Sequence, residues 1–324
     1  MEKINSNNIS ELIQTYRPNL KENSLKQYVF HLTKLKSLFE DNNFNFLNQP
    51  ESVMDKIKNN AYTSKRNTLN SIIVILRSVN ETDELIDKYV VKRDEFNNKY
   101  SDEQTKGVIS DKQKDNFIGV EEFTSMLKQM ACDIKHSKLK TKGSEKLSSN
   151  ERELLMVYTM FSILIEYPTR NDMAGMMYIS KSMYNKLTED DKKENNYIVT
   201  DRNSLMMILN VYKTSAKYGE KKIIISKPVE KIIRMYIKST GINIGDTLFV
   251  KRDGEPLTRN GVSKVLIKMS QKYIKKSIST TMIRKIVVSH KFAKLKEEQQ
   301  DMAYIMCHDV NTQNAVYVKS NGDD

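Results

Sequence analysis

Apolar residues recur at intervals of three and four along most of this sequence, and that spacing constrains the fold more than any other feature. It places the apolar side chains on one face of a helix, and such a face must be buried against other elements. Clear examples run through residues 25–39 and 69–79, and shorter candidates lie at about 8–16, 51–60 and 82–97. The first hundred residues are therefore predicted to form a compact helical bundle.

A polar stretch over residues 99–118 interrupts the helical pattern. It is poor in large apolar residues and shows no periodicity, as is typical of a linker between domains. A chain of 324 residues is also long enough for two domains. We therefore predict a helical domain over 1–98, a linker over 99–118 and a second domain over 119–324.

In the second domain the spacing of apolar residues changes from a helical to a strand pattern and then back to a helical one. Residues 151–166 are strongly apolar and predict a buried helix, which ends before Pro168 because the residue preceding a proline is disfavoured in the helical region. Short β-prone runs then predict a three-stranded antiparallel sheet over 197–200, 205–212 and 222–226. Further helices are predicted at 228–239, 258–274, 280–294 and 297–306, followed by a short terminal helix that contains Tyr317. The predicted fold class is α+β, mainly α with a small antiparallel β-sheet.

The charge of the chain restricts its partners. Its 53 Lys and Arg against 41 Asp and Glu give a net charge of +12, which favours an anionic partner, with nucleic acid ahead of a membrane surface. Basic residues on the polar faces of the first two long helices are placed to follow a phosphate backbone, although ordinary solvated side chains explain them equally well. They are Lys21, Lys26, Lys34, Lys36, Lys65, Arg66 and Arg77.

The sequence shows no apolar run close to the ~20 residues of a membrane span, and its start has no apolar signal-peptide core. We therefore expect a soluble intracellular protein that does not bind membranes. The two cysteines, Cys132 and Cys307, form no CxxC pair, and no two of the four histidines have the spacing of metal ligands on a helix. We expect neither a disulfide, nor a metal, nor a cofactor.

A histidine and a tyrosine, His308 and Tyr317, lie nine positions apart near the end of the chain. Alone, the pair is explained by a surface helix, because short motifs often match by chance. Three cations precede it, each next to a predicted element. Arg170 follows the buried helix in Tyr-Pro-Thr-Arg, Lys213 begins the connection between the last two predicted strands, and Arg284 lies near the start of a predicted helix.

In this order, and with Met-Cys-His at 306–308 in place of Leu-Gly-His, these residues resemble the tyrosine recombinases, the phage-type integrase family. The resemblance covers about 120–318 by motif, and it implies that a helical DNA-clamping domain precedes a mostly helical catalytic domain with a small sheet. It also implies the roles of the site residues. Tyr317 is the nucleophile, Lys213 is the general acid, and Arg170, Arg284 and His308 bind the phosphate.

Two departures from the family pattern concern this site. Thr281 stands where the family has the histidine of His-x-x-Arg, and it donates one hydrogen bond but carries no positive charge. Met173 replaces a carboxylate often found three residues after the first arginine, and the neighbouring Asp172 is the candidate substitute. Lys217 lies in the same connection as Lys213 and is the alternative general acid.

The residue types suit phosphoryl transfer. Guanidinium groups make paired hydrogen bonds to the non-bridging oxygens, and these bonds strengthen as negative charge builds during in-line attack. A tyrosine nucleophile then gives a 3′-phosphotyrosyl enzyme and a free 5′-hydroxyl, while a lysine protonates the departing oxygen. Because the covalent bond conserves the phosphoester energy, rejoining needs no ATP or metal.

The predicted function is site-specific recombination or integration of double-stranded DNA, by a dimer or tetramer assembled on it. A type IB topoisomerase uses the same chemistry as a monomer, and the seven residues after Tyr317, too few for a docking helix, keep that alternative open. A DNA-binding protein with a degenerate site is the third reading, which Thr281 supports. The sequence suggests a virus or mobile element and leaves open the DNA target, the recombination outcome and the compartment, whether host nucleus, cytoplasm or viral factory.

Overall fold

The computed structural model describes residues 4–39, 43–105, 107 and 111–318. The chain divides into two compact units, Met1–Ile109 and Ser110–Asp324. The division falls inside the stretch 99–118, where the sequence predicts a linker. The first part of that stretch is helical, because the preceding helix continues to Thr105.

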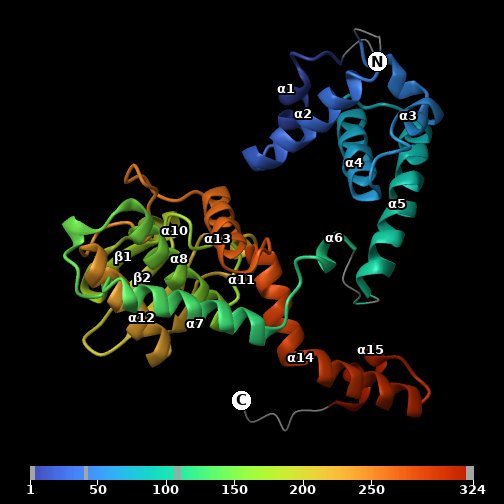
Figure 1. The fold of residues 1–324 in the computed structure, drawn as a ribbon. Helices are drawn as coiled ribbons and strands as arrows, with labels where there is room; N and C mark the ends of the chain where they lie inside the picture. The colour runs from blue at the N-terminus through green and yellow to red at the C-terminus, as the bar shows by residue number, and fades with distance from the viewer. Residues whose placement is uncertain (1–3, 40–42, 106, 108–110, 319–324) are drawn as a thin grey trace. The chain divides into compact units, whose positions relative to one another are not determined.

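The first unit is a bundle of helices, as the apolar spacing predicts (Figure 1). Helix α4 packs against α1, α2 and α5, and its apolar residues between Leu69 and Leu76 are buried. The buried Tyr89 of α5 donates its hydroxyl to the carbonyl oxygen of Leu47 at 2.9 Å, which ties α5 to a 3₁₀ turn. The helices are α1 (Ile9–Tyr16), α2 (Glu22–Lys36), α3 (Pro50–Lys56), α4 (Tyr62–Ser78) and α5 (Asp83–Thr105), with the 3₁₀ turn at Asn45–Asn48.

The second unit is organised around α8 (Ser149–Glu166), which packs against α7, α12, α13 and α14. A capping box formed by Ser148 and Glu151 begins α8, and seven of its ten buried residues are apolar. The remaining long helices are α7 (Val120–His136), α12 (Lys227–Thr240), α13 (Arg259–Ile274) and α14 (Thr280–Ile305), with short helices α6 (Asp111–Lys114), α9 (Lys181–Lys186), α10 (Glu189–Glu194), α11 (Ser215–Tyr218) and α15 (Val310–Thr312).

The sheet of the second unit is mixed rather than purely antiparallel. It contains β1 (Met177–Ser180), β2 (Tyr197–Thr200), β3 (Leu205–Leu209) and β4 (Lys221–Ile224) in that order. The last three strands pair antiparallel, as predicted, whereas β1 pairs parallel to β2 and is missing from the prediction. Parallel pairing requires a crossover, and α9 and α10 supply it with helices too short to produce a periodic signal. The fold class, mainly α with a small sheet, is confirmed.

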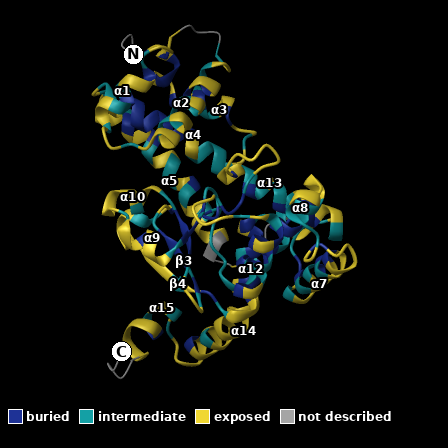
Figure 2. Ribbon diagram, turned by 90° about the vertical axis from the view of Figure 1, so that its left-hand side faces the viewer, coloured by how far each residue is buried: buried dark blue, intermediate teal, exposed yellow. Residues whose placement is uncertain are grey.

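Helix α14 is one continuous helix where the sequence predicts two, over 280–294 and 297–306. The prediction of a break was wrong because 280–305 contains no glycine or proline and is rich in strong helix formers. Beyond Val287 the helix buries only Ala303, and Figure 2 shows its remainder as exposed. We call residues 288–318 the C-terminal arm. No helix in the described part of the chain is long and apolar enough to cross a membrane.

Candidate active site

Arg170 lies directly after α8 in a short segment that a buried carboxylate organises. The Arg170 backbone N–H donates to Oδ2 of Asp172 at 3.2 Å, and the other oxygen of Asp172 accepts from the Arg259 guanidinium at 3.0 Å. Asp172 is only 4% exposed. Asp172, the candidate substitute for the missing carboxylate, therefore binds the guanidinium of Arg259, while Arg170 contributes only its backbone N–H. Met173 is fully buried in the core.

The neighbouring Asn171 connects this segment to two helices. Its amide donates to the Arg259 carbonyl oxygen at 2.8 Å and to the Ser263 hydroxyl at 2.9 Å, both on α13. Its carbonyl oxygen accepts from the Thr280 hydroxyl at 2.6 Å, at the start of α14. Because residues four apart share a helix face, Arg284 lies one turn beyond Thr280 on the side of α14 that meets this segment.

Threonine 280 rather than Thr281 makes the contact with the Arg170 segment. Thr280 is 4% exposed, whereas Thr281, one residue further along the helix, is exposed. Arg284 itself is half-buried. The predicted role of Thr281 as a hydrogen-bond donor in the site remains a prediction.

The loop that contains Lys213 is held to the same segment by Asn196, which is 3% exposed. The Asn196 amide donates to the carbonyl oxygens of Asp172 at 2.8 Å and Val211 at 3.0 Å. Its own oxygen accepts the backbone N–H groups of Asn210 and Val211, both at 2.8 Å. Every hydrogen-bonding group of this buried amide is satisfied, so the loop is fixed two residues before Lys213.

Lys213 and Lys217 differ in their surroundings. Lys213 is exposed at the start of the β3–β4 connection, next to the loop that Asn196 holds. Lys217 lies on α11 with its ammonium 5.1 Å from the centre of the Tyr218 ring. Lys213 lies two residues and Lys217 six residues after Val211, which Asn196 joins to the Asp172 backbone.

The net charge of this group of residues suits an anion. Arg170, Lys213, Arg259 and Arg284 contribute four positive charges, and Asp172 contributes one negative charge. Planar guanidinium groups match the geometry of a phosphate. No group of three or more His, Cys, Asp or Glu side chains suited to a metal ion occurs among the described residues.

The two predicted residues of the arm contact each other. The rings of His308 and Tyr317 stack, with their centroids 5.2 Å apart and an interplanar angle of 11°. Asp309 begins the intervening turn of helix by accepting the backbone N–H groups of Asn311 at 2.8 Å and Thr312 at 3.0 Å. A hydrogen bond from the Thr312 hydroxyl lowers the pKa of the Asp309 carboxyl. Tyr317, at 57% exposed, follows on one turn of π-helix, Gln313–Tyr317.

The structure does not bring the His308 and Tyr317 pair together with the segments that contain the three cations. Residues 284–305 belong to one helix, and at a rise of about 1.5 Å per residue the 21 steps from Arg284 to Ile305 cover about 31 Å. The hydrogen bonds of Asn171, Asp172 and Asn196 join the three segments that contain Arg170, Lys213 and Arg284, and we call this group of segments the phosphate cluster. His308 and Tyr317 form a second cluster on the arm.

The turn after α14 explains the Met-Cys-His motif. The His308 N–H donates to the Ala303 carbonyl oxygen at 3.0 Å and the Cys307 N–H to that of Tyr304 at 3.1 Å, the pattern of a Schellman motif. Cys307 therefore adopts φ +55°, a conformation that favours glycine. A glycine in the family motif suits the same turn.

We expect Cys307→Gly to stabilise this turn by about 0.5–1 kcal/mol, because glycine avoids the strain of a left-handed conformation. Amide hydrogen exchange at His308 should slow by about two- to fivefold. Cys132→Gly is the matched control, since Cys132 lies inside α7 and its substitution should speed local exchange. Faster exchange in Cys307→Gly would contradict the role of this turn.

Sequence reasoning missed two residues of the phosphate cluster region, Asn196 and Arg259. Arg259 is the first residue of α13, after the cap Thr258, whose hydroxyl accepts the Gly261 N–H at 3.1 Å. A cation at a helix N-terminus opposes the helix dipole, so its presence there was a signal. Asn196 gives no such signal, because its partners are distant in sequence.

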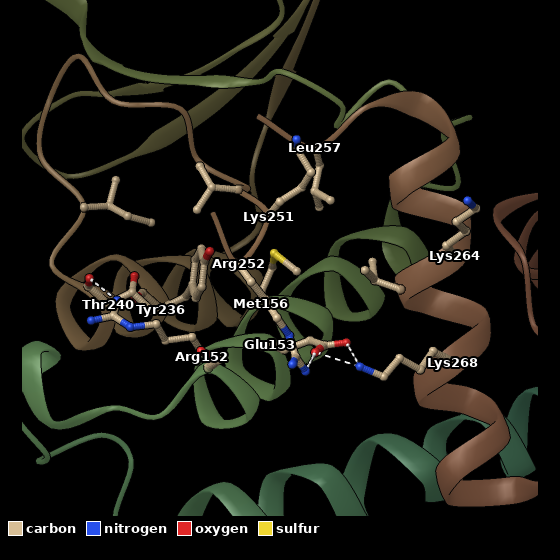
Figure 3. Close-up of a pocket in the computed structure, with 14 residues that line it drawn as sticks. Arg152, Glu153, Met156, Tyr236, Thr240, Lys251, Arg252, Leu257, Lys264 and Lys268 are labelled. Atoms are coloured by element: carbon tan, nitrogen blue, oxygen red, sulfur yellow. Dashed lines mark hydrogen bonds and ion pairs between the residues drawn. The ribbon is translucent and has the colours of Figure 1, made fainter. Parts of the chain in front are cut away.

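A separate cavity of about 370 Å³ lies in the same unit, between α8, α12, α13 and the loop that precedes α13 (Figure 3). Its lining includes apolar side chains such as Met156 and Tyr236. The Glu153 carboxylate accepts from Lys268 at 2.6 Å and from Arg252 at 2.8 Å. The site residues predicted from the sequence do not line this cavity.

No protein-family model matches the chain, and no curated protein matches it. Solved structures do. The integrase of the Tn1549 transposon, in complex with transposon right end DNA, has 16% sequence identity and a TM-score of 0.52, over 97% of this chain and 96% of the integrase chain. XerA recombinase has 10% identity and a TM-score of 0.35, over 98% and 94% of the two chains. XerH site-specific recombinase bound to its difH substrate has 10% identity and a TM-score of 0.38, over 97% and 91%.

The likeness to the Tn1549 integrase concerns the fold. The chain has the fold of the tyrosine recombinases, and the resemblance inferred from the motifs is confirmed at that level. The likeness extends over nearly the full length of both chains.

Proposed function

We propose that the chain is a site-specific DNA recombinase or integrase that cleaves and rejoins strands through a 3′-phosphotyrosyl intermediate on Tyr317. The observation that carries this proposal is the phosphate cluster. Three segments far apart in sequence, which contain Arg170, Lys213 and Arg284, are joined there by the hydrogen bonds of Asn171, Asp172 and Asn196.

In the proposed reaction, Arg170 and Arg284 bind the non-bridging oxygens of one phosphodiester. The exposed Tyr317 phenol gives its proton to solvent water and its oxygen forms a bond to phosphorus, while the bond from phosphorus to the 5′ oxygen breaks. Lys213 gives a proton to that oxygen, and His308 donates a further hydrogen bond as negative charge develops. Attack by a 5′-hydroxyl from another strand reverses these steps and exchanges the strands.

The C-terminal arm must change position for this chemistry. Because His308 and Tyr317 stack on one another, a movement of the arm carries both residues together. We propose that bound DNA favours the arrangement in which the arm meets the phosphate cluster, and that recombination takes place in an oligomer, since two DNA sites must be paired.

Covalent capture tests the proposal. The full-length chain is incubated with nicked duplexes that contain candidate target sites, so that the short 5′-hydroxyl strand diffuses away after cleavage. A protein–DNA complex that survives denaturation, formed without ATP or metal, is the expected product. If the protein binds such duplexes tightly but forms no covalent product with any of them, the proposed chemistry is contradicted.

DNA binding by the first unit is expected to involve a group of cations on α4 that lie over aromatic rings of α5. Lys65 lies 5.3 Å from the Phe96 ring centre, and Arg66 lies 4.7 Å from that of Tyr100. Replacing both cations with alanine should weaken binding at every DNA sequence and lower the slope of log affinity against log salt by about 2, because each phosphate contact contributes about 1.

Lys88→Ala is the control for this measurement, since Lys88 is exposed on α5 and pairs with Glu84 at 3.1 Å. It should leave both affinity and salt slope unchanged. An unchanged slope in the Lys65 and Arg66 double variant would place the DNA contacts of this unit on other residues.

A further inference from the structure

Arg259 makes two contacts that join separate parts of the phosphate cluster. One guanidinium nitrogen donates to the buried Asp172 carboxylate at 3.0 Å, and the other donates to the Val211 carbonyl oxygen at 2.9 Å. The Asp172 carboxylate also holds the Arg170 backbone N–H. Val211 lies two residues before Lys213. One planar side chain therefore connects the Arg170 segment with the Lys213 loop.

These contacts are costly to lose and specific in geometry. The Asp172 side chain is 5% exposed, so without Arg259 its charge would be buried and lack its ion pair. The planar fork of a guanidinium binds two acceptors at once, which a lysine ammonium at the same place does less well. Asn196 also holds Val211 to the Asp172 backbone, so removal of Arg259 should loosen the loop rather than unfold it.

The distance that this bridge sets matters for proton transfer. A general acid acts only within hydrogen-bond reach of the departing oxygen, while the phosphate stays fixed by its arginines. A misplacement of about 1 Å can cost about a hundredfold in rate. The position of Lys213 relative to Arg170 is therefore a quantity on which the cleavage rate depends.

We propose that Arg259 is a positioning residue, which holds Lys213 at the distance from the Arg170-bound phosphate that proton transfer to the 5′ oxygen requires. This inference rests on the recombinase function proposed above. Arg259 then affects one step, the departure of the 5′ oxygen. Binding of the phosphate remains the role of Arg170 and Arg284.

The test compares two leaving groups on the same nicked duplex. One substrate has the ordinary 5′-bridging oxygen, and the other has sulfur at that position. A thiolate leaves without a proton donor, because the pKa of a thiol is about 8.5, far below that of an alcohol. A variant that fails only in proton delivery therefore recovers on the sulfur substrate.

We expect Arg259→Ala to slow covalent capture about a hundredfold on the oxygen substrate. On the sulfur substrate, its capture rate should be within about threefold of the wild-type rate. Lys213→Ala should show the same recovery. Arg170→Ala should be slow on both substrates, since its defect lies in phosphate binding. Arg259→Gln, which keeps one amide donor, serves as the second variant if the alanine variant folds poorly.

Arg252→Ala is the matched control. Arg252 is also a partly exposed arginine that pairs with a nearly buried carboxylate, Glu153, at 2.8 Å, but it lies beside the separate cavity of Figure 3. It should capture DNA at the wild-type rate on both substrates, and Glu153 keeps its ion pair with Lys268 at 2.6 Å.

Two results would overturn the proposal about Arg259. The first is a capture rate of Arg259→Ala that, relative to the wild type, is the same on both substrates, whether reduced or not. The second is a capture rate that recovers on the sulfur substrate in Arg259→Ala but not in Lys213→Ala. Failure of the recombinase function itself looks different, because the wild type would then form no covalent complex on either substrate.

Discussion

Tyr317→Phe is expected to abolish covalent capture of DNA while leaving noncovalent binding within about twofold of the wild type. The substitution removes one hydroxyl oxygen, the atom that forms the bond to phosphorus, and a phenyl ring has no other nucleophile. Its stacking on His308, at a centroid distance of 5.2 Å, needs only the ring and should persist. We expect no detectable covalent complex, because the remaining catalytic groups have no nucleophile to join to the phosphate.

Tyr304→Phe is the control for this substitution. Tyr304 is 86% exposed on the same arm, so its hydroxyl is at least as accessible as that of Tyr317. Capture should proceed at the wild-type rate in Tyr304→Phe, and peptide mapping of the trapped complex should find the nucleotide on Tyr317. A covalent complex formed by Tyr317→Phe would show that another residue is the nucleophile.

Arg284→Ala is expected to lower the rate of covalent capture by about a thousandfold, the size of loss found when a preorganised donor to a developing oxyanion is removed. The half-buried Arg284 lies one turn beyond Thr280, which binds Asn171 beside Arg170. Arg284→Lys keeps the charge but loses the paired hydrogen bonds, so its rate should fall between those of the alanine variant and the wild type.

Single-turnover capture rates at saturating protein measure this effect separately from DNA affinity. Arg234→Ala is the control, since Arg234 forms an ordinary ion pair with Glu230 on α12 at 2.8 Å and lies outside the phosphate cluster. If Arg284→Ala lost affinity but kept its single-turnover rate, Arg284 would be a DNA contact without a role in the chemical step.

Long helices with a regular apolar face were predictable from the sequence. The face through Leu69, Ile72, Ile73 and Leu76 is buried in α4, and the apolar stretch after Ser148 is α8. Strand β2 begins and ends at the predicted residues, 197 and 200. In these segments the local pattern and the tertiary packing favour the same structure, so a short window of sequence contains enough information.

The errors lie where the local pattern was weak or ambiguous. The four residues of β1 show no alternation, and their partner in β2 comes after α9 and α10. The helical stretch 280–305 contains two apolar faces that suggest two helices, yet no breaker separates them. Continuity of α14 in turn sets the position of the arm, so this error bears directly on the candidate site.

The sequence by itself determined the identity and order of the candidate residues, Arg170, Lys213, Arg284, His308 and Tyr317, because residue chemistry and spacing are local properties. Only the tertiary structure decided which of them meet. The bridge from Asp172 to Arg259 joins residues 87 positions apart. About 31 Å of helix α14 separates Arg284 from the turn that precedes the stacked His308 and Tyr317. Contacts between distant residues depend on how helices pack and continue, which no local pattern records.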